Sequence, residues 1–221
     1  MWQALFAKYN QQNFVVIAVA MDSRPHAARP WIEQAAPDYP CLIDRNHHVA
    51  DLYNMVNVPQ AVWIDEDGII VRPTESAGAF EGFRQMDRTN FQTPEAVQQK
   101  TAAARQTYLA AIADWINQGT ASSFAFDAAT ARAHLKPTDQ TVALANAHFR
   151  LGQYLLAQGE TEAGEAQLQQ AVALRPESWN FWRQAAPAAV MGLAAGPEFW
   201  TRVDALGENR YYDPVDMEGM P

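Results

Sequence analysis

The sequence lacks the thiol pairs and the long apolar runs by which many sequences are assigned to a class of protein. It holds one cysteine, Cys41, among 221 residues. One cysteine makes no intramolecular disulfide, no Cys-x-x-Cys pair and no thiolate zinc site, so cysteine usage does not reveal the compartment. No apolar run reaches the roughly 18 residues that a membrane span needs. The first twelve residues show no basic-then-apolar signal-peptide design and are typical of the middle of a helix.

Positive charge is also scarce. There are 16 Lys and Arg residues against 25 Asp and Glu residues, and the formal net charge is −9. A nucleic-acid binder usually presents a basic face, and an anionic membrane attracts basic segments, so we expect neither as a partner. The sequence shows no phosphate loop, no dinucleotide-binding glycine pattern and no Ser-His-Asp order. We therefore expect no cofactor.

What the chain does have is apolar residues, at 48%, which are enough for a real core. Its length allows one large domain or two small ones. The first third alternates between helical and strand-like patterns in the order α-β-α-β-α-β-β. The continuous apolar run 14–22 predicts a strand buried on both faces, as in a parallel sheet. The other expected elements are a helix at 2–12, a short helix within 28–40 that starts near Pro30 and stops before Pro37, a strand at 41–44, a helix at 47–55, and a hairpin of 60–65 and 69–73 around Glu66-Asp67-Gly68. In the helix at 47–55 we expect Val49, Leu52 and Tyr53 to face inward.

One stretch of this region carries a family resemblance. Residues 39–71 read YPCLIDRNHHVADLYNMVNVPQAVWIDEDGIIV. An aromatic-Pro-apolar strand ends in Asp, a short helix ends in Tyr, and Val-Pro leads into a strand-turn-strand with an Asp-x-x-Gly turn. This order resembles the thioredoxin-like redoxins of the TlpA/ResA type, which are related to the AhpC/TSA peroxiredoxins. The resemblance covers about residues 1–73 and implies a thioredoxin-like α/β domain.

The resemblance also implies a site. In this family the Val-Pro bond is cis, the proline lies against the redox disulfide, and the preceding residue offers its backbone to an extended substrate. By match, Pro59 is that proline and Val58 is that neighbour. The family's Cys-x-x-Cys motif has no counterpart here, so we expect no catalytic residue and no redox activity. Cys41 occupies an apolar strand position, so we interpret this one thiol as a small buried core residue.

The resemblance further implies that the domain is incomplete at its N-terminus. The chain begins inside the family's first helix, and the central strand that precedes this helix is absent. Three explanations stay open: a natural start further upstream, a strand supplied by another chain or a swapped segment, or a reorganised sheet. The second explanation favours a homodimer, in which one copy of the chain supplies the strand that the other lacks. Relatives are often extracytoplasmic in bacteria, but the sequence leaves the localisation open.

The second half reads as helical. We place a linker at 76–93 between a thioredoxin-like domain at 1–75 and an all-α domain at 94–221. Thr93-Pro94-Glu95 starts a helix that ends at Gly119. Further helices are expected near 127–135, 139–158, 161–174, 179–192 and 197–206, followed by an irregular tail.

The hairpin at about 139–176 resembles a tetratricopeptide repeat. Leu151-Gly152 allows a close helix approach, Gly159 makes the turn, and Pro176 falls at the expected distance, whereas Gly164 stands where alanine is usual. One good repeat is fewer than the three or more that a solenoid needs. The hairpin therefore either forms a groove for a protein or peptide partner or packs on its neighbours and caps the redoxin-like domain.

Other polar residues are weighed against metal and acid–base roles. His47 and His48 are adjacent and point apart, so even with Asp44 and Asp51 nearby we expect solvated polar residues and no metal site. Asp22 is interpreted as an exposed loop carboxylate. Asp65, Glu66 and Asp67 fit turn chemistry. The aromatic residues near the C-terminus are interpreted mostly as core.

Two hypotheses from different classes remain for the function. The first is a thiol-disulfide oxidoreductase or peroxiredoxin relative whose cysteines lie upstream. The second is a redox-inactive protein-interaction module.

Overall fold

The chain folds into two compact units, each built from two separate stretches of sequence. The computed structural model describes residues 1–24, 26–186 and 196–221. One unit combines Met1–Val58 with Lys136–Ala194, and the other combines Pro59–Leu135 with Ala195–Pro221. Compactness does not measure independent folding, so the expected domains at 1–75 and 94–221 with a linker at 76–93 stay a prediction.

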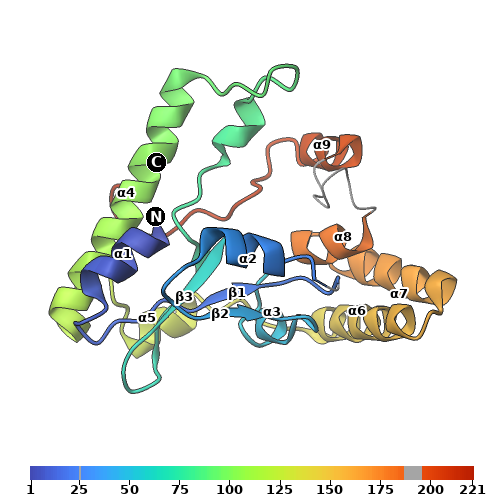
Figure 1. Cartoon of the computed structure of the whole chain (residues 1–221), viewed down its shortest axis with the longest axis horizontal. Coiled ribbons are helices and arrows are strands. Elements are labelled where there is room, and N and C mark those ends of the chain that lie inside the picture. Colours follow the sequence, from blue (N-terminus) through green and yellow to red (C-terminus); the bar gives the residue numbers. More distant parts are fainter. Residues whose placement is uncertain (25, 187–195) are drawn as a thin grey trace. The chain divides into compact units, whose positions relative to one another are not determined.

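The first unit starts with the expected alternation of helices and strands (Figure 1). β1 and β2 pair in parallel, with Ala18 opposite Cys41 and Ala20 opposite Ile43. The edge-to-face contact between Phe6 and Tyr39, at 5.9 Å between ring centroids, joins the first helix to the segment before β2. The elements are α1 Trp2–Tyr9, β1 Ala18–Ala20, α2 Arg29–Ala35, β2 Cys41–Ile43 and α3 His48–Leu52.

Three expectations about burial in this unit are wrong. The run 14–22 forms a strand only at Ala18–Ala20, and Val15 and Ile17 are more than half exposed. Among the described residues β1 pairs with β2 alone, and β2 is three residues long, so little of the run is covered. Cys41 is half-buried and not fully buried. Leu52, expected to face inward, is 67% exposed, because the short α3 turns His47 and Ala50 inward.

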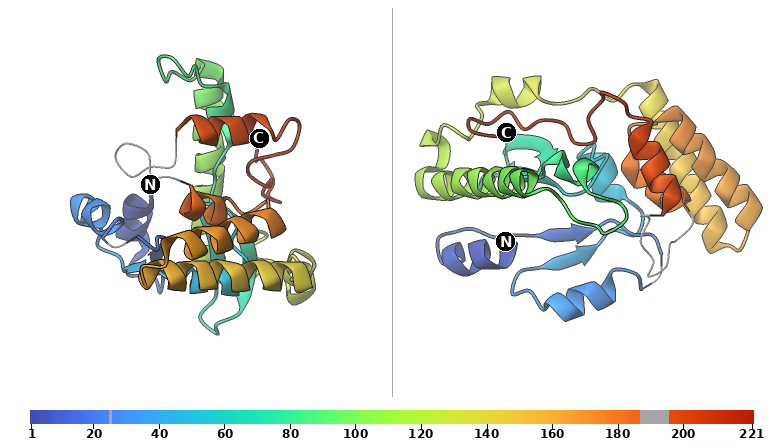
Figure 2. Two further views of the ribbon diagram at one scale, coloured as in Figure 1. Left: turned by 90° about the vertical axis from the view of Figure 1, so that its right-hand side faces the viewer. Right: turned by 90° about the horizontal axis from the view of Figure 1, so that it is seen from above.

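The same unit is completed by three helices from the second half of the chain. Asp139 and Ser178 cap α6 and α8 by accepting the backbone N–H groups of Val142 and Phe181. Gly159, at φ 85°, makes the turn between α6 and α7, which lie side by side in Figures 1 and 2. The helices are α6 Gln140–Ala157, α7 Thr161–Leu174 and α8 Trp179–Ala185. Residues 187–192 of the helix that was expected near 179–192 lie outside the described residues.

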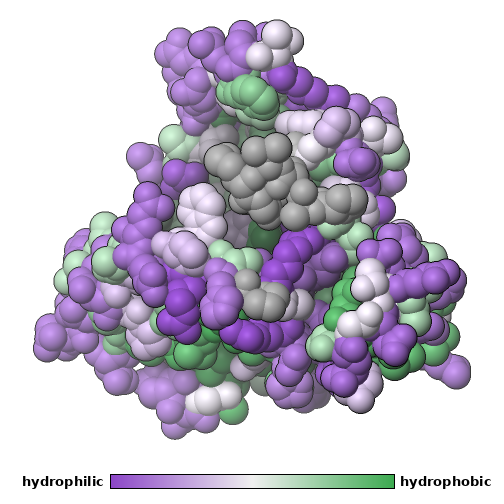
Figure 3. Space-filling view, turned by 45° about the vertical axis from the view of Figure 1, so that its right-hand side comes forward, coloured by the Kyte–Doolittle hydropathy of each residue, from purple (hydrophilic) through white to green (hydrophobic). Residues whose placement is uncertain are grey.

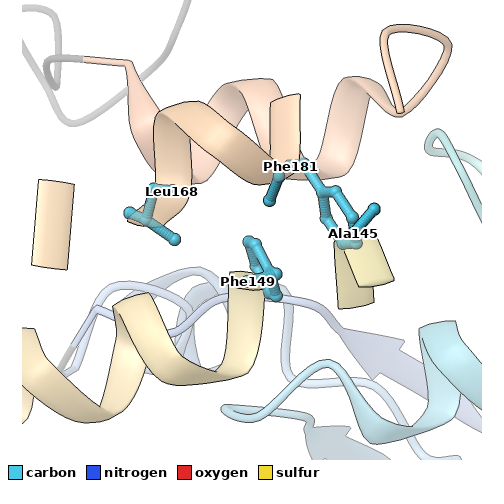
Figure 4. Close-up of a cluster of buried hydrophobic side chains, with 5 residues drawn as sticks. Ala145, Phe149, Leu168 and Phe181 are labelled. Atoms are coloured by element: carbon cyan, nitrogen blue, oxygen red, sulfur yellow. The ribbon is translucent and has the colours of Figure 1, made fainter. Parts of the chain in front are cut away.

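A small hydrophobic core joins these three helices. Phe149 points from α6 toward Leu168 of α7 and Phe181 of α8 (Figure 4). The rings of Phe149 and Phe181 stack with centroids 4.2 Å apart. Gly152 and Gly164 let α6 and α7 approach closely, since a Cβ on either would lie about 3 Å from the other's carbonyl oxygen. The close approach expected at Gly152 is therefore confirmed.

The second unit is built on the expected hairpin. Asp65 organises the turn: its side chain accepts the backbone N–H groups of Asp67 and Ile69, and Gly68 takes φ 79°. The turn role expected for Asp65, Glu66 and Asp67 is thus confirmed. The elements are β3 Gln60–Ile64, β4 Ile70–Ser76, η1 Glu81–Gln85, α4 Glu95–Gln118, η2 Gly119–Ala121, α5 Ala128–Ala133 and α9 Pro197–Asp204.

A buried polar network ties this hairpin to α4. The Tyr108 hydroxyl accepts a hydrogen bond from Trp63 Nε1 at 2.9 Å and donates one to Glu75 Oε1 at 3.0 Å. Arg72, 1% exposed, makes a bidentate ion pair with Glu75 and donates to the carbonyl oxygens of Phe124 and Asp216. Each buried polar group in this network therefore has a partner.

The last four aromatic residues of the chain, Phe199, Trp200, Tyr211 and Tyr212, gather around Phe83 in the same unit. Phe83 of η1 lies within 4.8 Å of Tyr211 and 6.1 Å of Trp200, measured between ring centroids. Tyr211, Val215 and Met217 are buried, so the irregular tail contributes to the core, as expected of this aromatic end. The face in Figure 3 is mostly hydrophilic, in keeping with the charged composition.

Candidate functional site at the carboxyl ends of β1 and β2

Ligands of open α/β sheets bind outside the carboxyl ends of the parallel strands. Two loops in the first unit meet this description, and a third loop, after α3, is held beside them because the Asn180 side chain donates to both Met21 and Met55. We call these three the carboxyl-end loops. Residues 21–24 follow β1, residues 44–47 follow β2, and residues 54–57 follow α3. Each of the three contacts the helical segment α6–α8, which therefore covers this edge of the sheet.

The loop 44–47 is organised by Asp44 at the end of β2. Its two carboxylate oxygens accept the backbone N–H groups of His48 at 2.9 Å and Val49 at 2.7 Å. A carboxylate that accepts the first free N–H groups of a helix stabilises the start of that helix. The chain reaches this start through His47, which takes the left-handed conformation at φ 51°. This conformation and the capped helix together turn the His47 ring inward.

His47 is consequently buried. Its side chain is 3% exposed, and its ring packs edge-to-face on Phe149 with centroids 4.9 Å apart. Neither ring nitrogen has a hydrogen-bond partner among the described residues. Burial lowers the pKa of His47 to about 4, against the opposing attraction of the carboxylates of Asp44 and Asp22. The imidazole is therefore neutral at pH 7.

A small cavity of about 10 Å³ lies beside His47, about the space of one water molecule. Two arginines that line it are already paired: Arg150 donates to Asp51, and Arg175 donates to Asn54 and Glu177. The lining residues are Asn46, His47, Ala50, Asp51, Met55, Asn146, Phe149, Arg150, Arg175 and Phe181.

The loop 54–57 is held by α8. Asn180 donates its backbone N–H to the carbonyl oxygen of Val56 at 3.1 Å and its side-chain amide to that of Met55 at 3.0 Å. Arg183 donates to the side-chain oxygen of Asn57 at 3.0 Å, and the same oxygen accepts the Val58 backbone N–H at 2.9 Å. Residues 55–58 are thus fixed by one face of a two-turn helix.

The loop 21–24 is tied to the same helices. Gln153 of α6 donates to the Ser23 hydroxyl, and the Ser23 backbone N–H donates to the Gln184 side chain at 3.3 Å. Arg24 donates to the carbonyl oxygens of Arg183 and Ala186 at 3.0 and 3.1 Å. A cation at the last carbonyl groups of a helix is a favourable placement. Asp22 accepts the Arg24 backbone N–H, so it shapes the loop.

The structure separates the residues that the sequence singled out. Val58 lies beside the carboxyl-end loops and is 38% exposed, while Pro59 begins the approach to β3, where its carbonyl oxygen accepts the Ala77 N–H at 3.3 Å. Cys41 lies at the amino end of β2, opposite the first residue of β1, so the thiol is at the far end of the strand from these loops. The substrate-binding role of Val58 and Pro59 stays a prediction.

The two histidines point apart as expected, but the prediction that both are solvated is wrong for His47, which is buried, and holds for the exposed His48. Among the described residues, no group of three His, Cys, Asp or Glu side chains could hold a metal ion. No described helix is both long and apolar enough to cross a membrane.

Sequence reasoning missed the polar residues of α6–α8 that bind the carboxyl-end loops. Asn146, Phe149 and Gln153 have the spacing i, i+3, i+7 of one helix face, which is a usable signal for a contact face. The sequence does not indicate what that face contacts. Asn180 and Arg183 share a second such face on α8.

Comparison with known proteins agrees with the prediction that the first third of the chain is redoxin-like. Residues 2–72 match the family model described as AhpC/TSA family, which covers about a third of the chain. This segment is therefore thioredoxin-like, and a mostly helical region follows it. Neither the curated proteins nor the solved structures contain a match to the chain.

Proposed function

We propose that these 221 residues form a redoxin-related protein-interaction module that carries out no thiol–disulfide exchange with its own side chains. The observation that carries the proposal is the position of the only cysteine. Cys41 is half-buried at the amino end of β2, and the carboxyl-end loops where a ligand of this sheet would bind contain no thiol. Disulfide exchange needs an accessible thiolate and, for release, a second thiol.

The proposed partner is a protein or an extended peptide, with the carboxyl-end loops and the Val58-Pro59 segment as its site. Val58 is 38% exposed beside the carboxyl-end loops, and the family resemblance implies that its backbone meets an extended substrate. The TlpA/ResA-type ancestry, the cis Val58-Pro59 bond and the tetratricopeptide-like character of α6–α7 belong to this proposal. The net charge of −9 argues against nucleic acid as the partner.

An insulin-reduction assay tests the absence of redox chemistry. We expect the purified chain to give no turnover above the dithiothreitol background. Turnover by the wild type would contradict the proposal, and its loss in Cys41→Ser would assign the activity to the thiol. Treatment with peroxide provides a second check, because a sulfenic acid at Cys41, detected by mass, would indicate a peroxidatic cysteine instead.

A homodimer is the second arrangement that an observation favours. Among the described residues β1 is paired along one edge only, and an unpaired edge recruits another strand. Sedimentation equilibrium measures the mass directly. A dimer whose 14–20 amides are protected from exchange supports strand pairing between copies, and a monomer at roughly 100 µM contradicts it.

A further inference from the structure

The contact between α6–α8 and the carboxyl-end loops is polar at its edges and has one apolar centre. Side-chain hydrogen bonds from Gln153, Asn146 and Asn180 surround the rings of His47, Phe149 and Phe181, of which His47 meets Phe149 edge-to-face and Phe149 stacks on Phe181. Parts of a fold that are held by few apolar contacts open at a lower free energy than the rest of the fold. The helical segment therefore has the construction of a lid over the face to which the proposed function assigns a partner.

The centre of this lid contains the histidine with no hydrogen-bond partner. A neutral imidazole has one donor and one acceptor, and His⁺ has two donors. In the closed arrangement neither His47 nitrogen has a hydrogen-bond partner among the described residues, while the ring lines the cavity and packs on Phe149. The protonated ring therefore fits the closed arrangement poorly and is solvated once α6–α8 moves away.

From this geometry we propose that His47 is an acid-sensitive trigger, whose protonation opens α6–α8 and uncovers the carboxyl-end loops. The inference rests on the proposed function only for the use of the uncovered face. Opening itself concerns this chain alone and is measured without any partner.

The charges around His47 determine the direction of the effect. Asp44 and Asp22, from the loops after β2 and β1, stabilise the imidazolium but do not outweigh its burial. On α3, Asp51 faces the cavity and is paired with Arg150 of α6. At the end of α7, Arg175 also lines the cavity and is paired with Glu177. Within each of these two ion pairs the opposite charges cancel, so neither pair adds net charge around the ring. From α8, only the apolar Phe181 lines the cavity.

The direction of the pH dependence follows from the linkage between proton binding and closure. An exposed histidine has a pKa of about 6.5 and the covered His47 has one of about 4, so the open form binds more protons between these values. Closure is fully favourable above pH 6.5 and weakens as the pH falls toward 4. Between pH 7.5 and 4.5 the equilibrium should shift toward the open form by roughly 10- to 100-fold.

One backbone amide reports directly whether the lid is open or closed. Asn180 is in the first turn of α8, where a backbone N–H has no partner within the helix, and it donates instead to Val56 across the contact. The Ala18 and Asp44 amides, which donate to Pro40 and Ala20 between the strands, report the sheet. Hydrogen exchange corrected for intrinsic rates therefore separates lid opening from global unfolding.

The experiment measures these protection factors by NMR from pH 7.5 to 4.5 in the full chain. We expect Asn180 to lose protection by 10- to 100-fold while Ala18 and Asp44 change little. His47→Asn removes the titration and tolerates the left-handed backbone, so it should abolish the pH dependence. His48→Asn, at the adjacent exposed position, is the matched control and should behave as the wild type. Because Asp51 and Asp44 are intact in every variant, their own titration is common to all.

Three outcomes would overturn the inference: unchanged protection of Asn180 across the pH range, equal losses at Asn180 and Ala18, or the same pH dependence in His47→Asn. If His47→Asn does not fold, His47→Gln replaces it with an amide of longer reach. Partner binding is not a readout here, so failure of the proposed function leaves this test valid.

Discussion

At the scale of single residues, the buried polar groups show where substitution is most costly. Tyr108 is enclosed between Trp63 and Glu75, and burial raises the pKa of its phenol well above the ordinary value. The hydroxyl therefore stays protonated near neutral pH and donates to the Glu75 carboxylate. It serves as acceptor and donor at once, so removing it affects two partners.

Tyr108→Phe should lower the free energy of unfolding by about 1–3 kcal/mol, because it leaves the Trp63 N–H without its acceptor and removes one of the donors to Glu75, which keeps its ion pair with Arg72. Urea denaturation followed by circular dichroism measures the loss. Tyr154→Phe is the control, since Tyr154 is 61% exposed on α6 and should change stability by less than about 0.5 kcal/mol. Equal effects of the two substitutions would refute the role assigned to Tyr108.

The residues differ in how far the sequence predicted them. Asp65 was predicted as a turn residue because its bonding partners lie two to four positions away, within reach of local rules. The neighbours of His47 could not be predicted in this way. Phe149 is about a hundred positions further along the chain, and no local pattern links them. Sequence reasoning consequently placed His47 in solvent, and the structure buries it.

At the scale of elements, the α6–α7 hairpin depends on two glycines that face each other. A Cβ at Gly152 would lie 2.9 Å from the Gly164 carbonyl oxygen and equally close to the Leu168 side chain. The backbone oxygen cannot move without shifting α7. The two helices therefore require glycine at this crossing, although glycine is a poor helix former.

Gly152→Ala should therefore destabilise the chain, with overpacking that costs about 1–3 kcal/mol set against a gain of up to about 1 kcal/mol in helix propensity. Thermal unfolding is the measurement, and the midpoint should fall by several degrees. Glu165→Ala, at an exposed position of α7 next to Gly164, is the control and should leave the midpoint nearly unchanged. A midpoint raised by Gly152→Ala would mean that α6 and α7 are further apart than described.

The order of the elements followed from hydrophobic patterning, but their extent did not. All seven expected elements of residues 1–76 form in the expected order, because strand and helix periods differ clearly over even short runs. The 14–22 strand shrinks to three residues, since the length of a strand is set by its pairing partner and not by its own apolar run. A partner strand's length cannot be deduced from one segment alone.

At the scale of the whole molecule, the chain passes three times between the two compact units. Composition suggested a division in sequence order, because residues 74–93 are rich in small and polar residues. The packing instead assigns α6–α8 to the unit that contains β1 and β2, through hydrogen bonds such as Arg183–Asn57 and Gln153–Ser23. Similarly, α4 contributes Tyr108 to the unit that contains β3 and β4. Long-range polar contacts of this kind leave no mark on composition.

Two fragments distinguish these divisions. Residues 1–93 and 94–221, expressed separately, would each lack a part of both compact units. We therefore expect neither fragment to unfold cooperatively in urea, and we expect the two, when co-expressed, to copurify and regain a cooperative transition with the midpoint shifted below that of the full chain. Cooperative unfolding of each fragment alone, with dispersed NMR spectra, would instead support independent domains on either side of the 76–93 linker. The isolated 1–93 fragment would then also expose His47 and titrate it near pH 6.5, a direct measure of the burial that α6–α8 provides.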